Sequence, residues 1–261
     1  MFKYVVANFK THKSAKQVRE YFEQLNKFVD NQKSTGHLES VYPMIFLNHL
    51  HVLVANEVAT KNVMVGAQSG FHMDEGAYTS AVSLKQLNDD GINTVLIGHS
   101  EEFLFFHETF ESVNKKLLKA LEIGLKPVVC FGEQEVQIEF EKTIKHLEKQ
   151  LDIILQGVKP EDFNKIVLAY EPRWAIGKTQ SLGQEKAGEI ILAVKKYVER
   201  NFKCSVDVLY GGSVKVDTIE GFIRQDSIDG VLIGKEALDV EKYIDMLKIT
   251  DQVLAEIKNE K

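Results

Sequence analysis

The sequence has few of the features that mark secreted or membrane-spanning proteins. Its 261 residues include only two cysteines, Cys130 and Cys204, which lie far apart. Two such cysteines form no disulfide framework, and they fit a reducing compartment. No apolar run approaches the roughly 18–20 residues of a membrane-spanning helix, and residues 1–10 lack the apolar core of a signal peptide. We therefore expect a cytoplasmic protein with no membrane association.

An excess of positive charge is also missing. The formal net charge is −6, so the sequence offers no basic footprint for a nucleic acid, and we expect none as a partner. Hydrophobic residues make up 44% and charged residues 27% of the chain, which is ordinary for a globular protein with a sizeable core. The length permits one large α/β domain or two small ones, and no linker divides the chain.

Short runs of apolar and β-branched residues recur along the whole chain. Each run is nearly continuous in apolar character, as expected for a strand that is buried on both faces. The eight runs are residues 4–9, 44–47, 63–65, 94–97, 127–131, 166–170, 206–210 and 230–233. The stretches between them have apolar residues at helical spacing, with charged residues on the opposite face.

Eight strand-like runs that alternate with helices predict a closed (β/α)₈ barrel. We expect residues 1–261 to form one such domain, in which residues 248–261 are a helical or frayed tail. The competing topology is an open, doubly wound sheet. That topology usually has a glycine fingerprint after its first strand, and the segment ANFKTHKS at this place contains no glycine.

Polar residues and glycines follow several of the predicted strands, where a (β/α)₈ barrel forms its active site. They are Asn8, Lys10, His99, Ser100, Glu101, Gly132, Glu133, Glu171, Gly211, Gly212, Ser213, Gly234 and Lys235. A desolvated carboxylate can take a proton from a carbon beside a carbonyl. An imidazole can polarise the carbonyl, a lysine can stabilise the enediolate charge, and glycine-turn amides can hold a phosphate. Each residue alone is ordinary, but together at one end of a barrel they predict proton transfer on a phosphorylated carbonyl compound.

Four stretches, taken together and in order, resemble the triosephosphate isomerase family. They are ANFK at 7–10, IGHSE at 97–101, AYEPRWAIG at 169–177 and YGGSV at 210–214. The resemblance runs from about Val5 to Leu247. It implies the interconversion of dihydroxyacetone phosphate and glyceraldehyde 3-phosphate, in glycolysis and gluconeogenesis, without a cofactor. We expect no metal ion either, since the H-x-H pair at 49–51 has no third ligand nearby.

The resemblance also assigns roles to single residues. It implies that Glu171 is the base, His99 a neutral electrophilic imidazole, and Lys10 the electrostatic stabiliser. The implied contacts to the substrate and its phosphate are Asn8, Gly177, Ser213, Gly234 and Lys235, and the supporting residues are Glu101, Ile176 and Leu232. Ile176 and Leu232 match an apolar pair that closes over the base, while Pro172 stiffens the first hinge of a lid.

Several positions depart from the family pattern. Glu102 and Phe103 replace two arginines, which places Glu102 near Glu108 as a like-charge pair. Lys235 replaces a second glycine, and it would be strained by about 1 kcal/mol if its φ were positive. The lid sequence IGKTQS is shorter than usual, and Arg173 inside the lid has no sequence-based explanation.

The segment GAYTS at 76–80 resembles a loop that plugs into a partner subunit, with Thr79 reaching toward the neighbour's site. We therefore expect a homodimer, the commonest symmetric assembly.

Two other functions are compatible with the same residues. The shortened lid and Lys235 could suit a related isomerase that acts on a four-carbon ketose phosphate. A barrel that binds phosphate without catalysis is the other alternative, but the presence of Lys10, His99 and Glu171 together argues against it.

Overall fold

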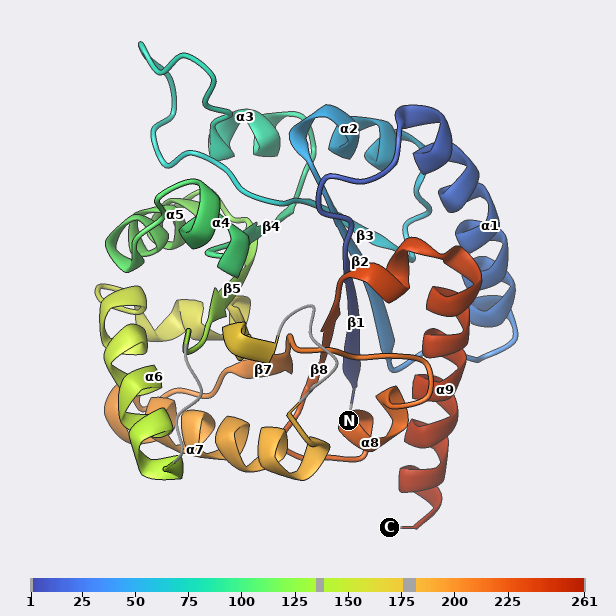
Figure 1. Cartoon of the computed structure of the whole chain (residues 1–261). Helices are drawn as coiled ribbons and strands as arrows, with labels where there is room; N and C mark the ends of the chain where they lie inside the picture. The colour runs from blue at the N-terminus through green and yellow to red at the C-terminus, as the bar shows by residue number, and fades with distance from the viewer. Residues whose placement is uncertain (1, 135–138, 176–181, 261) are drawn as a thin grey trace.

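The computed structural model describes residues 2–134, 139–175 and 182–260, which form a closed barrel of eight parallel strands (Figure 1). The strands are β1 Lys3–Asn8, β2 Val41–Leu47, β3 Met64–Ala67, β4 Thr94–Ile97, β5 Lys126–Phe131, β6 Val167–Tyr170, β7 Asp207–Tyr210 and β8 Gly230–Ile233. They pair in chain order, and β8 pairs with β1 to close the barrel. The (β/α)₈ prediction is confirmed, and the open-sheet alternative is wrong.

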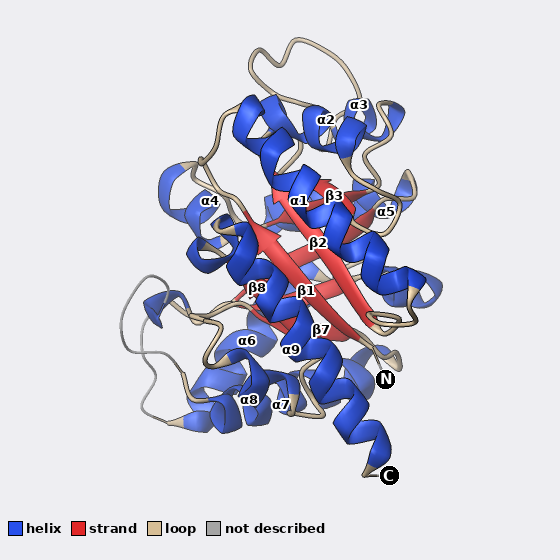
Figure 2. Cartoon of the chain, turned by 90° about the vertical axis from the view of Figure 1, so that its right-hand side faces the viewer, coloured by secondary structure: helices blue, strands red, loops and turns tan. Residues whose placement is uncertain are grey.

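Helices surround the barrel on its outside (Figure 2). They are α1 Ala15–Ser34, α2 His49–Val58, α3 Leu84–Asp89, α4 Ser100–Phe105, α5 Phe110–Glu122, α6 Phe140–Ile154, α7 Gln184–Phe202, α8 Ile219–Ile223 and α9 Val240–Asn259, with 3₁₀ turns η1 Pro160–Lys165, η2 Arg173–Ala175 and η3 Lys235–Leu238. None of the helices in the described segments is long and apolar enough to cross a membrane.

The C-terminal segment is part of a docked helix. Residues 248–259 continue α9, and Thr250, Val253 and Leu254 on this helix are buried. These side chains pack into the molecule, and the helix extends to Asn259.

The strands are apolar almost throughout because both of their faces are buried. Along β1, Val5 and Ala7 belong to the core between strands and helices, while Tyr4 and Val6 belong to the core inside the barrel. Alternate residues of a strand point to opposite faces, so both sets must be apolar. Cys130 also lies in the interior core.

Candidate active site

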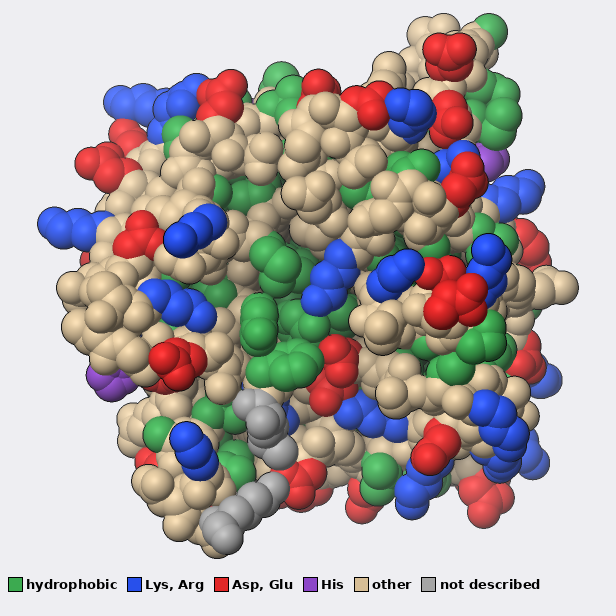
Figure 3. Space-filling view, turned by 180° about the vertical axis from the view of Figure 1, so that it is seen from behind, with side chains coloured by type: hydrophobic (Ala, Val, Ile, Leu, Met, Phe, Trp, Pro, Cys, Tyr) green, Lys and Arg blue, Asp and Glu red, His purple; other side chains and the backbone are tan. Residues whose placement is uncertain are grey.

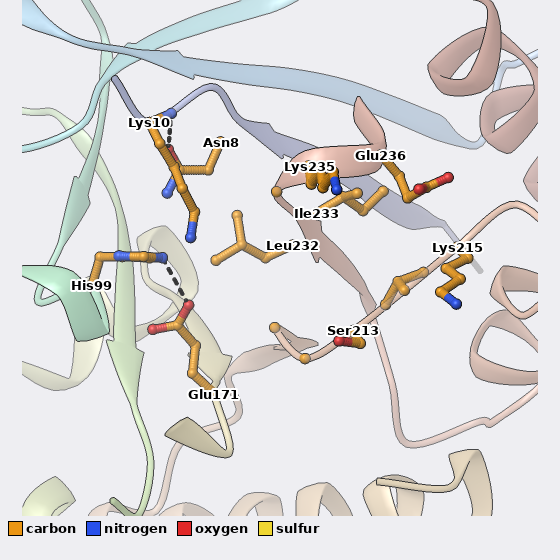
Figure 4. Close-up of a pocket in the computed structure, with 14 residues that line it drawn as sticks. Asn8, Lys10, His99, Glu171, Ser213, Lys215, Leu232, Ile233, Lys235 and Glu236 are labelled. Atoms are coloured by element: carbon orange, nitrogen blue, oxygen red, sulfur yellow. Dashed lines mark hydrogen bonds and ion pairs between the residues drawn. The ribbon is translucent and has the colours of Figure 1, made fainter. Parts of the chain in front are cut away.

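A pocket of about 440 Å³ opens at the carboxyl ends of the strands, where several of the predicted side chains meet (Figure 4). The predicted residues that line it are Asn8, Lys10, His99, Glu171, Ser213, Leu232, Gly234 and Lys235. Glu101 reaches the pocket through its contact with Lys10. Ile176 and Gly177, together with the rest of the lid to residue 181, lie outside the described residues.

Glu171 is buried at the tip of β6 because its neighbours leave it room. Its backbone N–H donates to the carbonyl oxygen of Phe131 at 2.8 Å, which continues the pairing of β6 with β5. A Cβ atom on Gly132 would lie 1.7 Å from the Glu171 carbonyl oxygen, and one on Gly211 would lie 2.8 Å from its Cγ. Only glycine on the adjoining strand ends therefore permits this position for the carboxylate.

The Glu171 carboxylate is held in its ionised form. Its Oε1 lies 3.2 Å from Nε2 of His99, and its Oε2 accepts the backbone N–H of Ser100 at 3.1 Å. Burial acts to raise the pKa of Glu171, but His99, the Ser100 amide and Lys10 outweigh burial and hold the pKa below the ordinary value for glutamate. The site thus keeps a charged carboxylate in a place from which water is largely excluded.

His99 is positioned by the start of α4. It is the N-cap residue, and its Nδ1 accepts the backbone N–H of Glu101 at 3.2 Å. Burial acts to lower the pKa of His99, whereas the negative charge of Glu171 and the hydrogen bond to it act to raise this pKa. The net result is a pKa above the ordinary value for histidine. The bond from the Glu101 amide requires an unprotonated Nδ1, so we assign the proton to Nε2, where it faces Glu171.

Lys10 adopts a left-handed backbone conformation, with φ 50°. Such a conformation costs a residue other than glycine on the order of 1 kcal/mol, so it must be held by its surroundings. The Lys10 N–H donates to Oδ1 of Asn8 at 2.9 Å, and the Gln68 amide donates to the Lys10 carbonyl oxygen at 3.1 Å. The Lys10 Nζ contacts Oε1 of Glu101 at 2.8 Å, and this ion pair directs the ammonium into the site.

Gln68 is a site residue to which no role was given from the sequence. Its Nε2 also donates to Oδ1 of Asn8 at 3.0 Å and to the Phe46 carbonyl oxygen at 3.1 Å. It therefore ties together the ends of β1 and β2. Its only signal in the sequence is its place as the first polar residue after the third strand.

The far side of the pocket is suited to a phosphate. Ser213, Gly234 and Lys235 line it, away from His99 and Glu171, and Lys215 adds a second cation there (Figure 4). Lys235 is not among the described residues with positive φ, so lysine fits this position without the strain of a left-handed backbone. Leu232 projects between Lys10 and Glu171 and gives the pocket an apolar wall (Figure 4).

Comparison with known proteins connects this geometry to one family. The family model described as triosephosphate isomerase matches residues 3–250. A triosephosphate isomerase of Caldanaerobacter subterraneus subsp. tengcongensis is 37% identical over 92% of this chain and 96% of its own length. Those of Mycoplasma pneumoniae and Aster yellows witches'-broom phytoplasma are 34% and 36% identical, over 95% and 98% of this chain and 98% and 93% of their own lengths.

The chain belongs to the triosephosphate isomerase family.

The carboxylates expected to repel one another in this family member share a cation. Glu102 and Glu108 both pair with Nζ of Lys116. The distance from Nζ to Oε1 of Glu102 is 3.5 Å. Burial raises the pKa of Glu102, and the pairing with Lys116 only partly offsets that effect. Oε2 of Glu102 also accepts the backbone N–H of Gly98 at 3.1 Å. The two glutamates therefore form an ion network around Lys116 next to α4, which supports the segment that carries His99.

Among the described residues, no group of three or more histidine, cysteine, aspartate or glutamate side chains is arranged to hold a metal ion. His49, half of the H-x-H pair, contacts the Ser69 carbonyl oxygen at 2.8 Å instead.

Proposed function

We propose that this chain interconverts dihydroxyacetone phosphate and D-glyceraldehyde 3-phosphate through an enediolate, as a step of glycolysis and gluconeogenesis. Membership of the triosephosphate isomerase family makes it an aldose–ketose isomerase. The observation that carries the assignment of roles is the 3.2 Å contact between Glu171 and His99, in the same pocket as Lys10. A base, an electrophile and a cation thus face one cavity.

Glu171 acts as the base that moves the proton between the two carbons. The C–H bond of the substrate breaks, an O–H bond forms on the carboxylate, and the electron pair moves to the carbonyl oxygen. The reverse transfer then delivers the proton to the neighbouring carbon. Both oxygens of Glu171 already have partners in His99 and Ser100, so it exchanges one of these contacts for the substrate. Desolvation strengthens the base once that exchange is made.

His99 and Lys10 act on the oxygen atoms of the substrate. The Nε2–H of His99 donates to the carbonyl oxygen and exchanges protons between the two oxygens of the enediolate. When Glu171 becomes protonated, the charge that raises the His99 pKa disappears, which favours the neutral ring during this stage. The Lys10 ammonium stabilises the negative charge as it develops on oxygen.

The phosphate is held at the opposite side of the pocket. We assign Ser213, Gly234 and Lys235 to this role, with Asn8 positioning the substrate beside Lys10, and Leu232 as an apolar wall. Gly177 and Ile176 keep the roles that the family resemblance implies. The comparisons give no support to the four-carbon substrate, since the matched relatives share the triosephosphate name.

We also propose that the protein is a cytoplasmic homodimer, with the loop around Thr79 at the interface. This loop between β3 and α3 stands out from the barrel (Figures 1 and 3). Tyr78 in this loop is 43% exposed, and Leu104, Phe105 and Phe106 of α4 and its C-cap are more exposed still, at 71%, 63% and 76%. Apolar exposure of this kind is typical of a surface that a partner covers. The cytoplasmic location follows from the glycolytic reaction.

The test of the base is a coupled assay of glyceraldehyde 3-phosphate isomerisation. Glu171→Gln keeps the size of the side chain but cannot accept the proton, so we expect turnover to fall by about 10²–10⁴-fold. Glu199→Gln, an exposed position on α7, is the matched control and should keep full turnover. A loss below tenfold in a folded Glu171→Gln protein would remove Glu171 from the role of base.

A further inference from the structure

Arg173 lies two residues after the base, and an aromatic ring holds its side chain. Its guanidinium carbon is 4.0 Å from the ring centroid of Phe103 and 5.8 Å from that of Phe110. Its Nε and Nη2 are buried and have no hydrogen-bond partner among the described residues. The cation–π contact with Phe103 therefore helps to fix this charged group.

Phe103 belongs to the helix that carries the electrophile. It is the fourth residue of α4, whose first residue is Ser100 and whose N-cap is His99. Phe103 packs in turn against Phe110 of α5, with 4.9 Å between the ring centroids. The ring therefore has a fixed position relative to the backbone that orients His99.

Two contacts consequently join the end of β6 to α4. The first is the contact of Glu171 with His99 and the Ser100 amide, and the second is the stack of Arg173 on Phe103. Pro172 lies between Glu171 and Arg173 in the chain. Its ring fixes its own φ and restricts the backbone of Glu171. A shift of the Arg173 side chain is thus transmitted to the carboxylate over a short and stiff path.

The charge of Arg173 also acts on the base. Burial lowers the pKa of the guanidinium, and the negative charge of Glu171 is the strongest influence that raises it, followed by Cys130 and Glu133. The same attraction favours the ionised form of Glu171. The other titratable groups that face Glu171 are His99, Lys10 and Cys130.

We propose that Arg173 is a positioning residue for the base: its stack on Phe103 fixes Glu171 against His99. Arg173 does not line the substrate pocket in the described part of the chain, so it acts through the residues that do. This inference rests on the proposed function, and it adds a residue that the family resemblance left without a role.

Three substitutions separate the stack from the charge. Arg173→Lys keeps the charge but removes the planar guanidinium. Phe103→Leu removes the ring on which the guanidinium stacks. Arg173→Leu removes the guanidinium and its charge together. We expect each to lower kcat by about tenfold with a smaller change in KM, because a misplaced base slows the chemical step more than binding. Only Arg173→Leu should move the acid limb of the kcat/KM profile to higher pH, since only it removes the charge.

Further variants test the contact itself. Phe103→Tyr keeps an aromatic ring and should retain kcat. The double variant Arg173→Lys/Phe103→Leu should lose no more than either single change, because both break the same contact. Arg200→Lys, which alters a guanidinium 5.7 Å from the Tyr197 ring on α7, is the matched control and should leave kcat unchanged.

Trp174 provides a readout that does not depend on turnover. It is the only tryptophan in the chain, it follows Arg173 directly, and its Nε1 donates to Oε1 of Glu133 at 2.8 Å. We expect its emission to change in Phe103→Leu and to match the parent in Phe103→Tyr and Arg200→Lys. Unchanged emission and unchanged kcat in a folded Arg173→Leu protein would overturn the proposal, as would additive losses in the double variant.

The two proposals fail in different ways. If the parent protein does not isomerise glyceraldehyde 3-phosphate, the proposed function fails, and the Trp174 emission series still tests the stack. If the parent is active and the variants lose only thermal stability at full kcat, the stack is structural and Arg173 has no positioning role.

Discussion

At the scale of single residues, the charged side chains of Glu171 and Lys10 both have partners. Glu171 has His99 and the Ser100 amide, and Lys10 has Glu101. A buried charge without such partners would neutralise itself, because desolvation disfavours the ionised form. The partners of Glu171 therefore decide whether its carboxylate stays charged, and each is a target for substitution.

Lys235 gives a prediction about binding rather than chemistry. Its side chain is exposed at the far side of the pocket, beyond the reach of the reacting carbons. An interaction made equally in the ground and transition states changes KM and not kcat, so we expect Lys235→Gln to raise KM about three- to tenfold. Added salt should raise KM of the parent more than that of the variant, because salt screens the ammonium.

Steady-state kinetics at two ionic strengths check this prediction. Lys196→Gln, at an exposed position of α7, is the control and should leave KM and its salt dependence unchanged. A fall in kcat without a change in KM for Lys235→Gln would mean that the lysine acts in the chemical step.

Which residues could be found from the sequence depended on whether their signal was local. Glu171, His99 and Lys10 follow predicted strands directly, so the strand pattern alone placed them at one end of a barrel. Gln68 and Arg173 could not be assigned in this way. Their roles arise from contacts with residues that are distant in the chain, such as Asn8 and Phe103, and no local pattern reports such contacts.

At the scale of elements, the apolar runs marked the strands well but missed some of their first residues. β1 and β5 begin at Lys3 and Lys126, one residue before the predicted starts. Both lysines are paired inside the fold: Lys3 Nζ donates to the Gln225 carbonyl oxygen at 3.1 Å, and Lys126 Nζ donates to the Tyr4 hydroxyl at 2.7 Å. Their polar character hid their place in a strand, because the pattern identifies apolar side chains rather than backbone pairing.

Glu102 on α4 gives a prediction about stability and pH. Burial raises the pKa of Glu102 in the folded protein above its value of 4.5 in the unfolded chain. At pH values between these two pKa values, Glu102 is therefore more often protonated in the folded protein than in the unfolded chain. Stability contributed at this position is therefore lost as pH rises through the folded pKa. Glu102→Gln removes this ionisation and leaves Lys116 paired with Glu108. We expect the difference in Tm, variant minus parent, to increase from pH 4.5 to pH 7.

Thermal unfolding followed by circular dichroism at several pH values makes the measurement. Glu122→Gln, at an exposed position on α5, serves as the control and should show no such trend. If the difference in Tm fell as pH rose, the pairing with Lys116 would outweigh burial, and the pKa of Glu102 would be lowered rather than raised.

At the scale of the whole molecule, closure of the barrel creates the site from distant parts of the chain. β1 pairs with β8, and a Cβ atom on Gly234 would lie 3.4 Å from Cε of Lys10. The sequence predicted this meeting because eight strands in parallel close into a ring, which brings the first and last strand ends together. It could not predict the ion network around Lys116 or the fit of Lys235, which depend on side-chain packing and on local backbone angles.

The last prediction concerns assembly. Leu104, Phe105 and Phe106 at the end of α4 are exposed, and the loop of Thr79 stands out from the barrel (Figure 1), so a second copy that covers these residues would bury apolar surface. A charge placed in the middle of such an interface must be desolvated without a partner, which commonly costs several kcal/mol. We expect Phe106→Glu to be a monomer at micromolar concentration by sedimentation, and the parent to be a dimer. Leu192→Glu, an exposed apolar position on α7, should remain dimeric.

The activity of the monomer then decides whether the partner takes part in the site. If Thr79 of one copy supports the site of the other, Phe106→Glu should lose kcat in proportion to the fraction of monomer and regain it at higher protein concentration. A monomer with full kcat at every concentration would limit the interface to stability. A parent protein that sediments as a monomer would contradict the dimer itself, because the exposed aromatic residues would then have no second copy to cover them.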